Sequence, residues 1–92
     1  MPRAKYEEPP AALVCLGQAL RELREAKGLK QIEVATAAGI TESQVSDIER
    51  SKNNPGWLLV MQLLGDGLGL SLADLAAAYE RAVEKAPGEG GA

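Results

Sequence analysis

The segment from residue 31 to residue 50, QIEVATAAGITESQVSDIER, constrains the fold of this chain more than any other stretch. Its apolar residues fall on one helical face on each side of Gly39, which predicts two short helices joined by a tight turn. Thr41 is placed to cap the second helix, and Ile40 is a buried spacer in the turn. The shared apolar face consists of Val34, Ala35, Ala38, Val45 and Ile48. Helices this short cannot each bury a core of their own, so they must cross and share one.

The crossing of these two helices accounts for the small residues near the turn. We expect Ala35 and Gly39 at the place where the helices approach closely and little bulk fits. Two short helices that cross in this way form a helix-turn-helix, and the second helix of such a unit can lie in the major groove of DNA.

The same pattern continues outside this segment, in the motifs LRELREAKGLKQIEVA, GITESQVSDIERSKNNP and LGLSLADL between about Leu16 and Leu75. On these motifs the chain resembles the Cro/C1-type (phage-repressor-like, XRE family) helix-turn-helix domain over about two thirds of its length. The resemblance implies an all-α, compact five-helix, lambda-repressor-like fold whose second and third helices read DNA. One position departs from the family, because the residue after Arg50 is usually glycine and is Ser51 here.

Composition limits the chain to one small helical domain. It has 92 residues, and 46% of them are hydrophobic, mostly Leu and Ala with no Phe, which favours a helical bundle over a sheet. The single Cys15 and the lack of His exclude an intramolecular disulfide and a structural zinc site, and we expect no cofactor. Cys15 is expected to be a small buried hydrophobe and not a redox sensor. With no 18-residue apolar run and no signal peptide, we expect a soluble cytoplasmic protein that does not contact a membrane.

The net charge of −3 is unevenly distributed along the chain. Residues 21–53 carry six cations and six anions, whereas residues 66–92 carry two cations and five anions. Affinity for DNA depends on local charge more than on total charge. The charge therefore neither supports nor excludes a DNA partner.

Breaks in the pattern divide the chain into an N-terminal arm over residues 1–9, a domain over residues 10–86 and a disordered tail over residues 87–92. The predicted helices cover about 10–27, 31–38, 42–50, 57–64 and 71–86. The fourth is apolar nearly all round and is expected to be largely buried, ending at the glycines of GDGLGL. Ser71 and Asp74 form a start that resembles a capping box for the fifth. Trp57 is expected to be a core plug; the alternative is a dimer or ligand contact.

The resemblance assigns contacts with DNA phosphates to the start of the second helix and to the loop after the third. These residues are Gln31, Arg50, Lys52 and Asn53. A backbone N–H at the start of a helix adds the positive end of the helix dipole to such a contact. Two plainer interpretations remain open: Gln31 caps its own helix, and the loop is an ordinary solvated turn.

Base readout is implied for the exposed face of the third helix, chiefly for its first, second and sixth residues. The candidates are Glu42, Ser43, Gln44, Ser46 and Asp47. Gln44 can bond an adenine edge through two hydrogen bonds, and serine is permissive. The carboxylates of Glu42 and Asp47 can accept from cytosine N4 or adenine N6, but they also repel phosphates. Either these acids specify a base, or this surface meets a protein.

Two further sets of residues are given structural or assembly roles. The resemblance implies a partly buried ion pair between Arg24 and Glu49, which would fix a helix crossing more than it adds net stability. The fifth helix carries a stripe of large apolar residues, namely Leu72, Leu75, Tyr79 and Val83. We expect its first half to complete the core and its extension to form a dimer interface.

The predicted function is a sequence-specific DNA-binding transcriptional regulator, a dimeric repressor that places the third helix in the major groove of double-stranded DNA. The alternative is an antitoxin-like or other protein-interaction module that uses the same fold and meets its partner through the C-terminal helix. An enzyme is not expected, because the sequence has no His, no Cys in a basic cleft and no evident pair of carboxylates converging on a pocket.

Overall fold

The computed structural model describes residues 8–85 of the chain, and this part is helical. The elements are α1 (Ala11–Ala26), α2 (Gln31–Ala38), α3 (Glu42–Glu49), α4 (Trp57–Gln62) with a π-helical turn after it (Leu63–Gly67), and α5 (Leu72–Lys85). The prediction of an all-α fold with five helices is confirmed. The predicted tail and most of the predicted arm lie outside the described residues.

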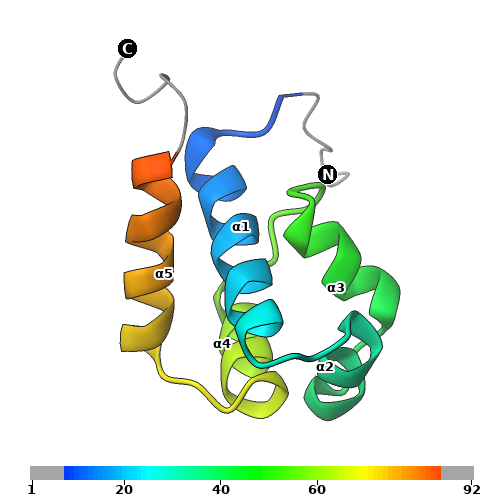
Figure 1. Cartoon of the computed structure of the whole chain (residues 1–92). Helices are drawn as coiled ribbons and strands as arrows, with labels where there is room; N and C mark the ends of the chain where they lie inside the picture. The colour runs from blue at the N-terminus through cyan, green and yellow to red at the C-terminus, as the bar shows by residue number, and fades with distance from the viewer. Residues whose placement is uncertain (1–7, 86–92) are drawn as a thin grey trace.

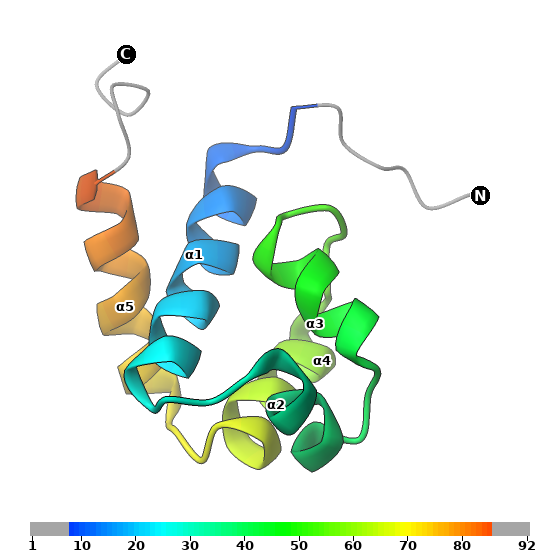
Figure 2. The ribbon, with the colours of Figure 1, turned by 45° about the vertical axis from the view of Figure 1, so that its right-hand side comes forward.

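Helix α1 occupies the middle of the molecule (Figure 1). Helix α5 packs along one side of α1, while α2 and α3 lie on the other side (Figures 1 and 2). Helix α2 also packs on the π-helical turn that follows α4. The helix-turn-helix unit is therefore held from behind by α1 and by the π-helical turn after α4, and the outer side of α3 faces away from the bundle.

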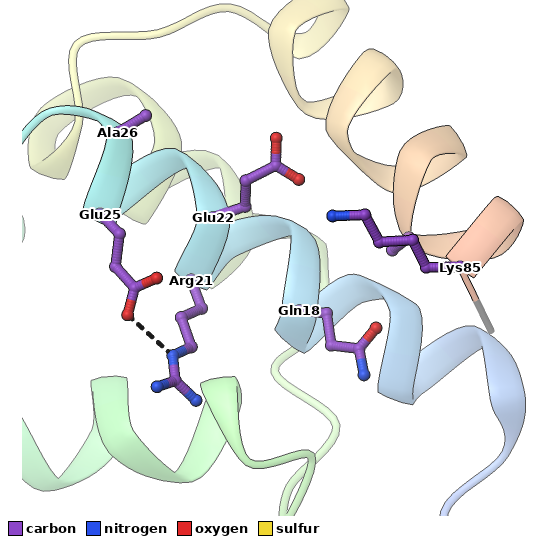
Figure 3. A pocket seen from close by; sticks show the side chains of 7 residues that line it. Gln18, Arg21, Glu22, Glu25, Ala26 and Lys85 are labelled. Atoms are coloured by element: carbon purple, nitrogen blue, oxygen red, sulfur yellow. Dashed lines mark hydrogen bonds and ion pairs between the residues drawn. The ribbon is translucent and has the colours of Figure 1, made fainter. Parts of the chain in front are cut away.

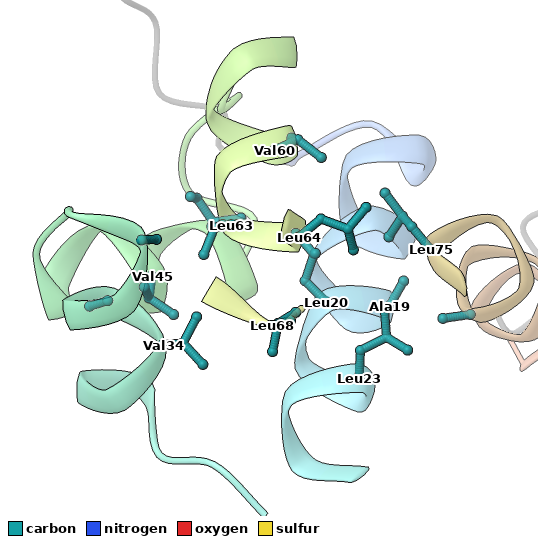
Figure 4. Packing of buried hydrophobic residues seen from close by; sticks show 14 residues of the cluster. Ala19, Leu20, Leu23, Val34, Val45, Val60, Leu63, Leu64, Leu68 and Leu75 are labelled. Carbon is teal, nitrogen blue, oxygen red and sulfur yellow. The ribbon is translucent and has the colours of Figure 1, made fainter. Parts of the chain in front are cut away.

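The core is built from aliphatic side chains of all five helices. Leu64 is fully buried at its centre, and Leu20, Val34 and Val45 approach from α1, α2 and α3 (Figure 4). Cys15 of α1 is also buried, with 4% of its surface exposed, which agrees with its predicted role as a small hydrophobe.

The prediction for Trp57 is wrong, because 61% of its surface is exposed and Leu58 beside it is 80% exposed. Helix α4 starts directly after Gly56, and its first turn lies outside the core. The residues that face the core are Val60 and then Leu63 and Leu64 of the following turn, three and four positions on. In an uninterrupted run of apolar residues this helical periodicity cannot be seen, and the expectation that the fourth helix is largely buried was also wrong.

The helix that begins with α4 does not end at the first glycine after Leu64. It continues as a π-helical turn over Leu63–Gly67, and Gly69 with φ of 68° follows it. A β-carbon on Gly67 would lie 3.0 Å from Cγ1 of Val34 and 3.3 Å from its carbonyl oxygen. The glycine thus lets this turn approach the backbone of α2.

Helix α5 begins with the predicted cap. The backbone N–H of Ser71 donates to Oδ2 of Asp74 at 2.9 Å, and the backbone N–H of Asp74 donates to Oγ of Ser71 at 3.3 Å. The hydrogen bonds from the backbone N–H and the hydroxyl of Ser71 lower the pKa of Asp74. The start of α5 is therefore fixed by side chains as well as by packing.

The face of α5 that meets α1 differs from the predicted stripe. Leu75, Ala78 and Ala82 are buried, whereas Leu72 and Val83 are 46% and 48% exposed. Leu75 completes the core, as expected for the first half of the stripe, and is therefore not available as a dimer contact. Leu72 does not complete the core as expected. Alanines let two helices pack closely, and a search for large apolar residues overlooks them.

Within residues 8–85, no single helix is long and apolar enough to span a membrane. Only the pair Trp57–Gly67 and Leu72–Lys85 is so when taken together, by length and composition alone, and the two are bent by 108°.

Candidate nucleic-acid interface

The turn between α2 and α3 depends on Gly39, which adopts the left-handed conformation with φ of 77°. Gly39 donates its N–H to the carbonyl oxygen of Thr36, and Ile40 donates to that of Ala35, which closes the end of α2. The nearest atom to a β-carbon on Gly39 is Nε2 of Gln62 at 3.8 Å, so space is not what selects glycine there. The expectation of a close approach holds for Ala35, which is fully buried, and is wrong for Gly39.

Helix α3 starts with a reciprocal cap between Thr41 and Gln44. The backbone N–H of Gln44 donates to Oγ1 of Thr41 at 3.0 Å. In return, Oε1 of Gln44 accepts from the backbone N–H of Thr41 at 2.9 Å and from its hydroxyl at 3.2 Å. This capping box satisfies two backbone donors at the point where the chain enters α3.

A bidentate ion pair joins α1 to the end of α3. Nε and Nη2 of Arg24 donate to Oε2 and Oε1 of Glu49 at 2.7 and 3.0 Å, and Nη1 of Arg24 donates to the carbonyl oxygen of Leu29 at 2.8 Å. The side chains of Arg24 and Glu49 are 12% and 5% exposed. Nε2 of Gln31 also donates to Oε1 of Glu49, at 2.9 Å. The pair implied by the resemblance is thus present, and Gln31 belongs to it.

The environment of Arg24 stabilises its charged form. The hydrogen bond to Glu49 is the main cause that raises the pKa of Arg24, and burial acts in the opposite direction. Because this network contacts the end of α1, the start of α2 and the end of α3, it fixes the orientation of the helix-turn-helix unit. The side chain of Gln31 points into the network and does not cap its own helix; there Glu33 accepts from the backbone N–H of Lys30 at 2.7 Å.

Gly17 and Ser51 hold α1 against the end of α3, and this contact was not predicted from the sequence. A β-carbon on Gly17 of α1 would lie only 2.7 Å from the carbonyl oxygens of Ile48 and Glu49. Ser51 has φ of 61°, is 6% exposed and donates its hydroxyl to the carbonyl oxygen of Leu13 at 3.2 Å. The positive φ explains why glycine is usual at this position in the resembling family. The serine in place of the usual glycine was the one feature of the sequence that indicated this contact.

The predicted base-reading residues are not equivalent in the structure. Glu42, Ser43 and Gln44 are exposed, whereas Ser46 and Asp47 are half-buried. These five residues follow one another around the first two turns of α3, on the side away from the core. Together they form the polar surface of α3, and Gln44 also lines a hollow with Leu59 of α4.

The loop after α3 lies next to this surface. Oδ2 of Asp47 accepts from Nδ2 of Asn53 at 3.4 Å, and its Oδ1 lies 3.9 Å from Nη2 of Arg50. The Arg50 side chain remains 59% exposed, and Lys52 is exposed as well. Three of the four predicted phosphate contacts therefore lie together after α3, whereas the side chain of Gln31 is bonded to Glu49.

Two of the hollows on the described part of the surface lie beside α1 and α3. One hollow, of about 660 Å³, lies between α1 and α5, where Glu22 and Lys85 face each other and Arg21 pairs with Glu25 (Figure 3). A smaller one of about 230 Å³ lies beside α3 and is lined by Gln44, Ile48, Asn53, Asn54, Pro55 and Leu59. Among residues 8–85, no three His, Cys, Asp or Glu side chains are grouped so that they could hold a metal ion.

A comparison with protein families matches residues 16–78 to the model described as a helix-turn-helix domain. The chain is similar to the HTH-type transcriptional regulator DdrOP3 of Deinococcus deserti, with 40% identity over 60 residues. The match covers 65% of this chain and 46% of that protein, so the chain spans about half the length of this curated relative.

Two solved structures resemble the chain in both sequence and fold. The restriction-modification controller protein C.AhdI from Aeromonas hydrophila has 38% identity and a TM-score of 0.66, over 71% of this chain and 93% of that one. The clp gene regulator ClgR from C. glutamicum has 30% identity and a TM-score of 0.71, over 87% of this chain and 99% of that one.

Proposed function

Because this chain belongs to the family of helix-turn-helix domains, we propose that it is a sequence-specific DNA-binding transcriptional regulator. In this proposal it acts as a dimeric repressor and inserts α3 into the major groove of double-stranded DNA. The observation that carries the proposal is the position of α3, whose polar face is exposed while its inner face is held by the Arg24–Glu49 pair.

The loop after α3 supplies the groups that contact a DNA backbone in this proposal. Arg50 and Lys52 extend from the loop after α3, and Asn53 offers an amide beside them. The side-chain amide of Gln31 is held by Glu49, so in this proposal Gln31 offers a phosphate its backbone N–H at the first turn of α2, where the helix dipole favours an anion. In this proposal these four residues hold the phosphates on either side of the groove that α3 enters.

Helix α5 supplies the dimer contact in this proposal. Leu72 and Val83 are about half exposed, and Tyr79, on the same stripe, is partly buried against the core. Helix α5 lies across α1 from α3, so a contact there leaves the DNA-facing surface open (Figures 1 and 2). A two-fold dimer would place two copies of α3 on half-sites about 34 Å apart.

The direct test is selection of bound duplexes from a random DNA library at ~100 mM salt, where non-specific binding is weakened. A regulator of this kind selects a palindrome with half-sites one helical turn apart. A well-folded protein that enriches no sequence would refute the proposal.

The phosphate contacts are tested by the double variant Arg50→Gln, Lys52→Gln. Each lost phosphate contact should lower the slope of log affinity against log salt by about 0.9. The matched control is Lys85→Gln, which removes a cation from α5 at the far hollow and should leave the slope unchanged. If the wild-type protein, the double variant and Lys85→Gln all show the same slope, Arg50 and Lys52 do not contact the phosphates.

The exposed apolar residues of α5 favour one second candidate, an antitoxin-like module that covers α5 with another protein. Asp74, Glu80 and Glu84 on this helix stand against Arg81 and Lys85, so the partner would meet α5 chiefly through its apolar residues. Charge reversal of Arg50 and Lys52 separates the two: a regulator loses its affinity for DNA, whereas a module that binds only protein is unaffected.

A further inference from the structure

The five polar residues on the outer face of α3 differ in how far their hydrogen-bonding groups are already used. Oε1 of Gln44 accepts two hydrogen bonds from Thr41, at 2.9 and 3.2 Å. A carbonyl oxygen has two lone pairs, so this acceptor is filled. Bidentate recognition of adenine needs the amide oxygen and the amide N–H₂ together. Gln44 can therefore read adenine in this way only if it gives up the cap of α3.

The position of Gln44 on the helix leads to the same conclusion. Its side chain lines the hollow beside α3 together with Ile48 and Leu59, toward α4. Substituting an N-terminal capping group typically costs on the order of 1 kcal/mol of helix stability. Gln44 is thus better described as a residue that builds the start of α3.

Asp47 also has partners within the protein. Its two carboxylate oxygens face Asn53 at 3.4 Å and Arg50 at 3.9 Å, and its side chain is 32% exposed. Both partners belong to the loop proposed to hold phosphates. The carboxylate therefore orients that loop and offsets part of the charge of Arg50.

Glu42 remains as the charged group on this face without such a contact. Within residues 8–85, the carboxylate of Glu42 takes part in no hydrogen bond and no ion pair, and its residue is exposed at the first position of α3. The positive end of the helix dipole offsets part of its charge there. Ser43 follows it and offers a hydroxyl that either donates or accepts.

We propose that Glu42 is the main specificity-determining residue of α3, and that it recognises an exocyclic amino group in the major groove, either cytosine N4 or adenine N6. The proposal rests on the DNA-binding function proposed above. Gln44 and Asp47 shape the reading surface and do not select the base. A carboxylate only accepts hydrogen bonds, and the donors that bases present in the major groove are cytosine N4 and adenine N6. These two amino groups are therefore the partners available to Glu42.

The test starts from the duplex selected by the wild-type protein, and the base preferred opposite Glu42 decides between cytosine and adenine. A second duplex then replaces that base with the analogue that lacks only the amino group. Wild-type protein should bind the amino-bearing duplex roughly 5- to 150-fold more tightly, the usual range for one base contact. Glu42→Ala should bind both duplexes equally.

The matched variants are Gln44→Glu and Asp47→Asn. Gln44→Glu keeps an acceptor for the backbone N–H of Thr41, so the cap persists while the amide donor is lost. Both variants should select the same base as the wild-type protein and keep its dependence on the amino group. Glu80→Gln on α5 controls for loss of a negative charge remote from α3.

The outcomes separate this inference from the proposed function. If the wild-type protein selects a palindrome and Glu42→Ala keeps the same preference for the amino group, the assignment of Glu42 is overturned while DNA binding stands. A changed base preference in Gln44→Glu overturns the assignment too. If the wild-type protein selects no sequence, the proposed function itself fails.

Discussion

Gly17 of α1 and Glu49 of α3 meet backbone to backbone, since a β-carbon on Gly17 would lie 2.7 Å from the carbonyl oxygen of Glu49. Gly17→Ala should therefore destabilise the protein. The added methyl would improve helix propensity by up to ~1 kcal/mol, but overpacking against backbone costs ~1–3 kcal/mol. Thermal unfolding measures the difference, with Gln18→Ala on the exposed side of α1 as the control. A melting temperature equal to or above that of the wild-type protein would contradict this contact.

Removing the carboxylate of Glu49 leaves Arg24 charged, nearly buried and without its bidentate partner. We expect Glu49→Ala to lower the free energy of unfolding by ~3–5 kcal/mol, as for other broken buried ion pairs. Urea denaturation monitored by circular dichroism gives this value. The control is Arg21→Ala, which removes an ion pair with Glu25 whose Arg21 side chain is 62% exposed and should cost less than about 1 kcal/mol. Similar losses for both variants would refute the structural role of Glu49.

At Ser51, backbone strain and a buried hydrogen bond act in opposite directions. Ser51→Gly relieves the positive φ but loses the hydrogen bond to Leu13, and each of these effects is worth ~1 kcal/mol. The two should nearly cancel. Ser51→Ala keeps the strain and loses the bond, so it should be about 1 kcal/mol less stable than Ser51→Gly. A reversed order of the two melting temperatures would show that the backbone strain is negligible.

The cap of α5 makes stability depend on pH. The pKa of Asp74 is lower in the folded protein than in the unfolded chain, because Ser71 donates to its carboxylate. Its contribution is therefore present above the ordinary aspartate pKa of about 3.9, and it is lost as the pH falls through the lower folded value. The gap in melting temperature between wild-type protein and Asp74→Ala should be constant near neutral pH and should close below about pH 4. A gap that persists in acid would exclude this linkage.

Helices whose apolar residues follow a periodic pattern could be predicted from the sequence. The apolar positions of α2 and α3 define two helices, and Thr41 and Ser71 identify helix starts, because these are local features. The pairing of Arg24 with Glu49 across 25 positions came from a family resemblance and not from periodicity.

The wrong predictions concern positions where tertiary packing decides which side chains are buried. Trp57 is exposed because the core ends at Val60, and a run of apolar residues does not show where a core ends. The stripe on α5 was misassigned because Ala78 and Ala82 make the contact with α1. The sequence also could not show that the acceptor of Gln44 is used by Thr41, since this depends on a side-chain conformation.

The position of Trp57 has a practical consequence for spectroscopy of this protein. It is the single tryptophan of the chain, and it lies at the start of α4 with its indole largely in water. Its fluorescence will change little when the core melts, because the ring is hydrated before and after unfolding. The same emission will respond strongly to any molecule that covers the start of α4. Intrinsic fluorescence is thus a poor reporter of folding here and a built-in reporter of association.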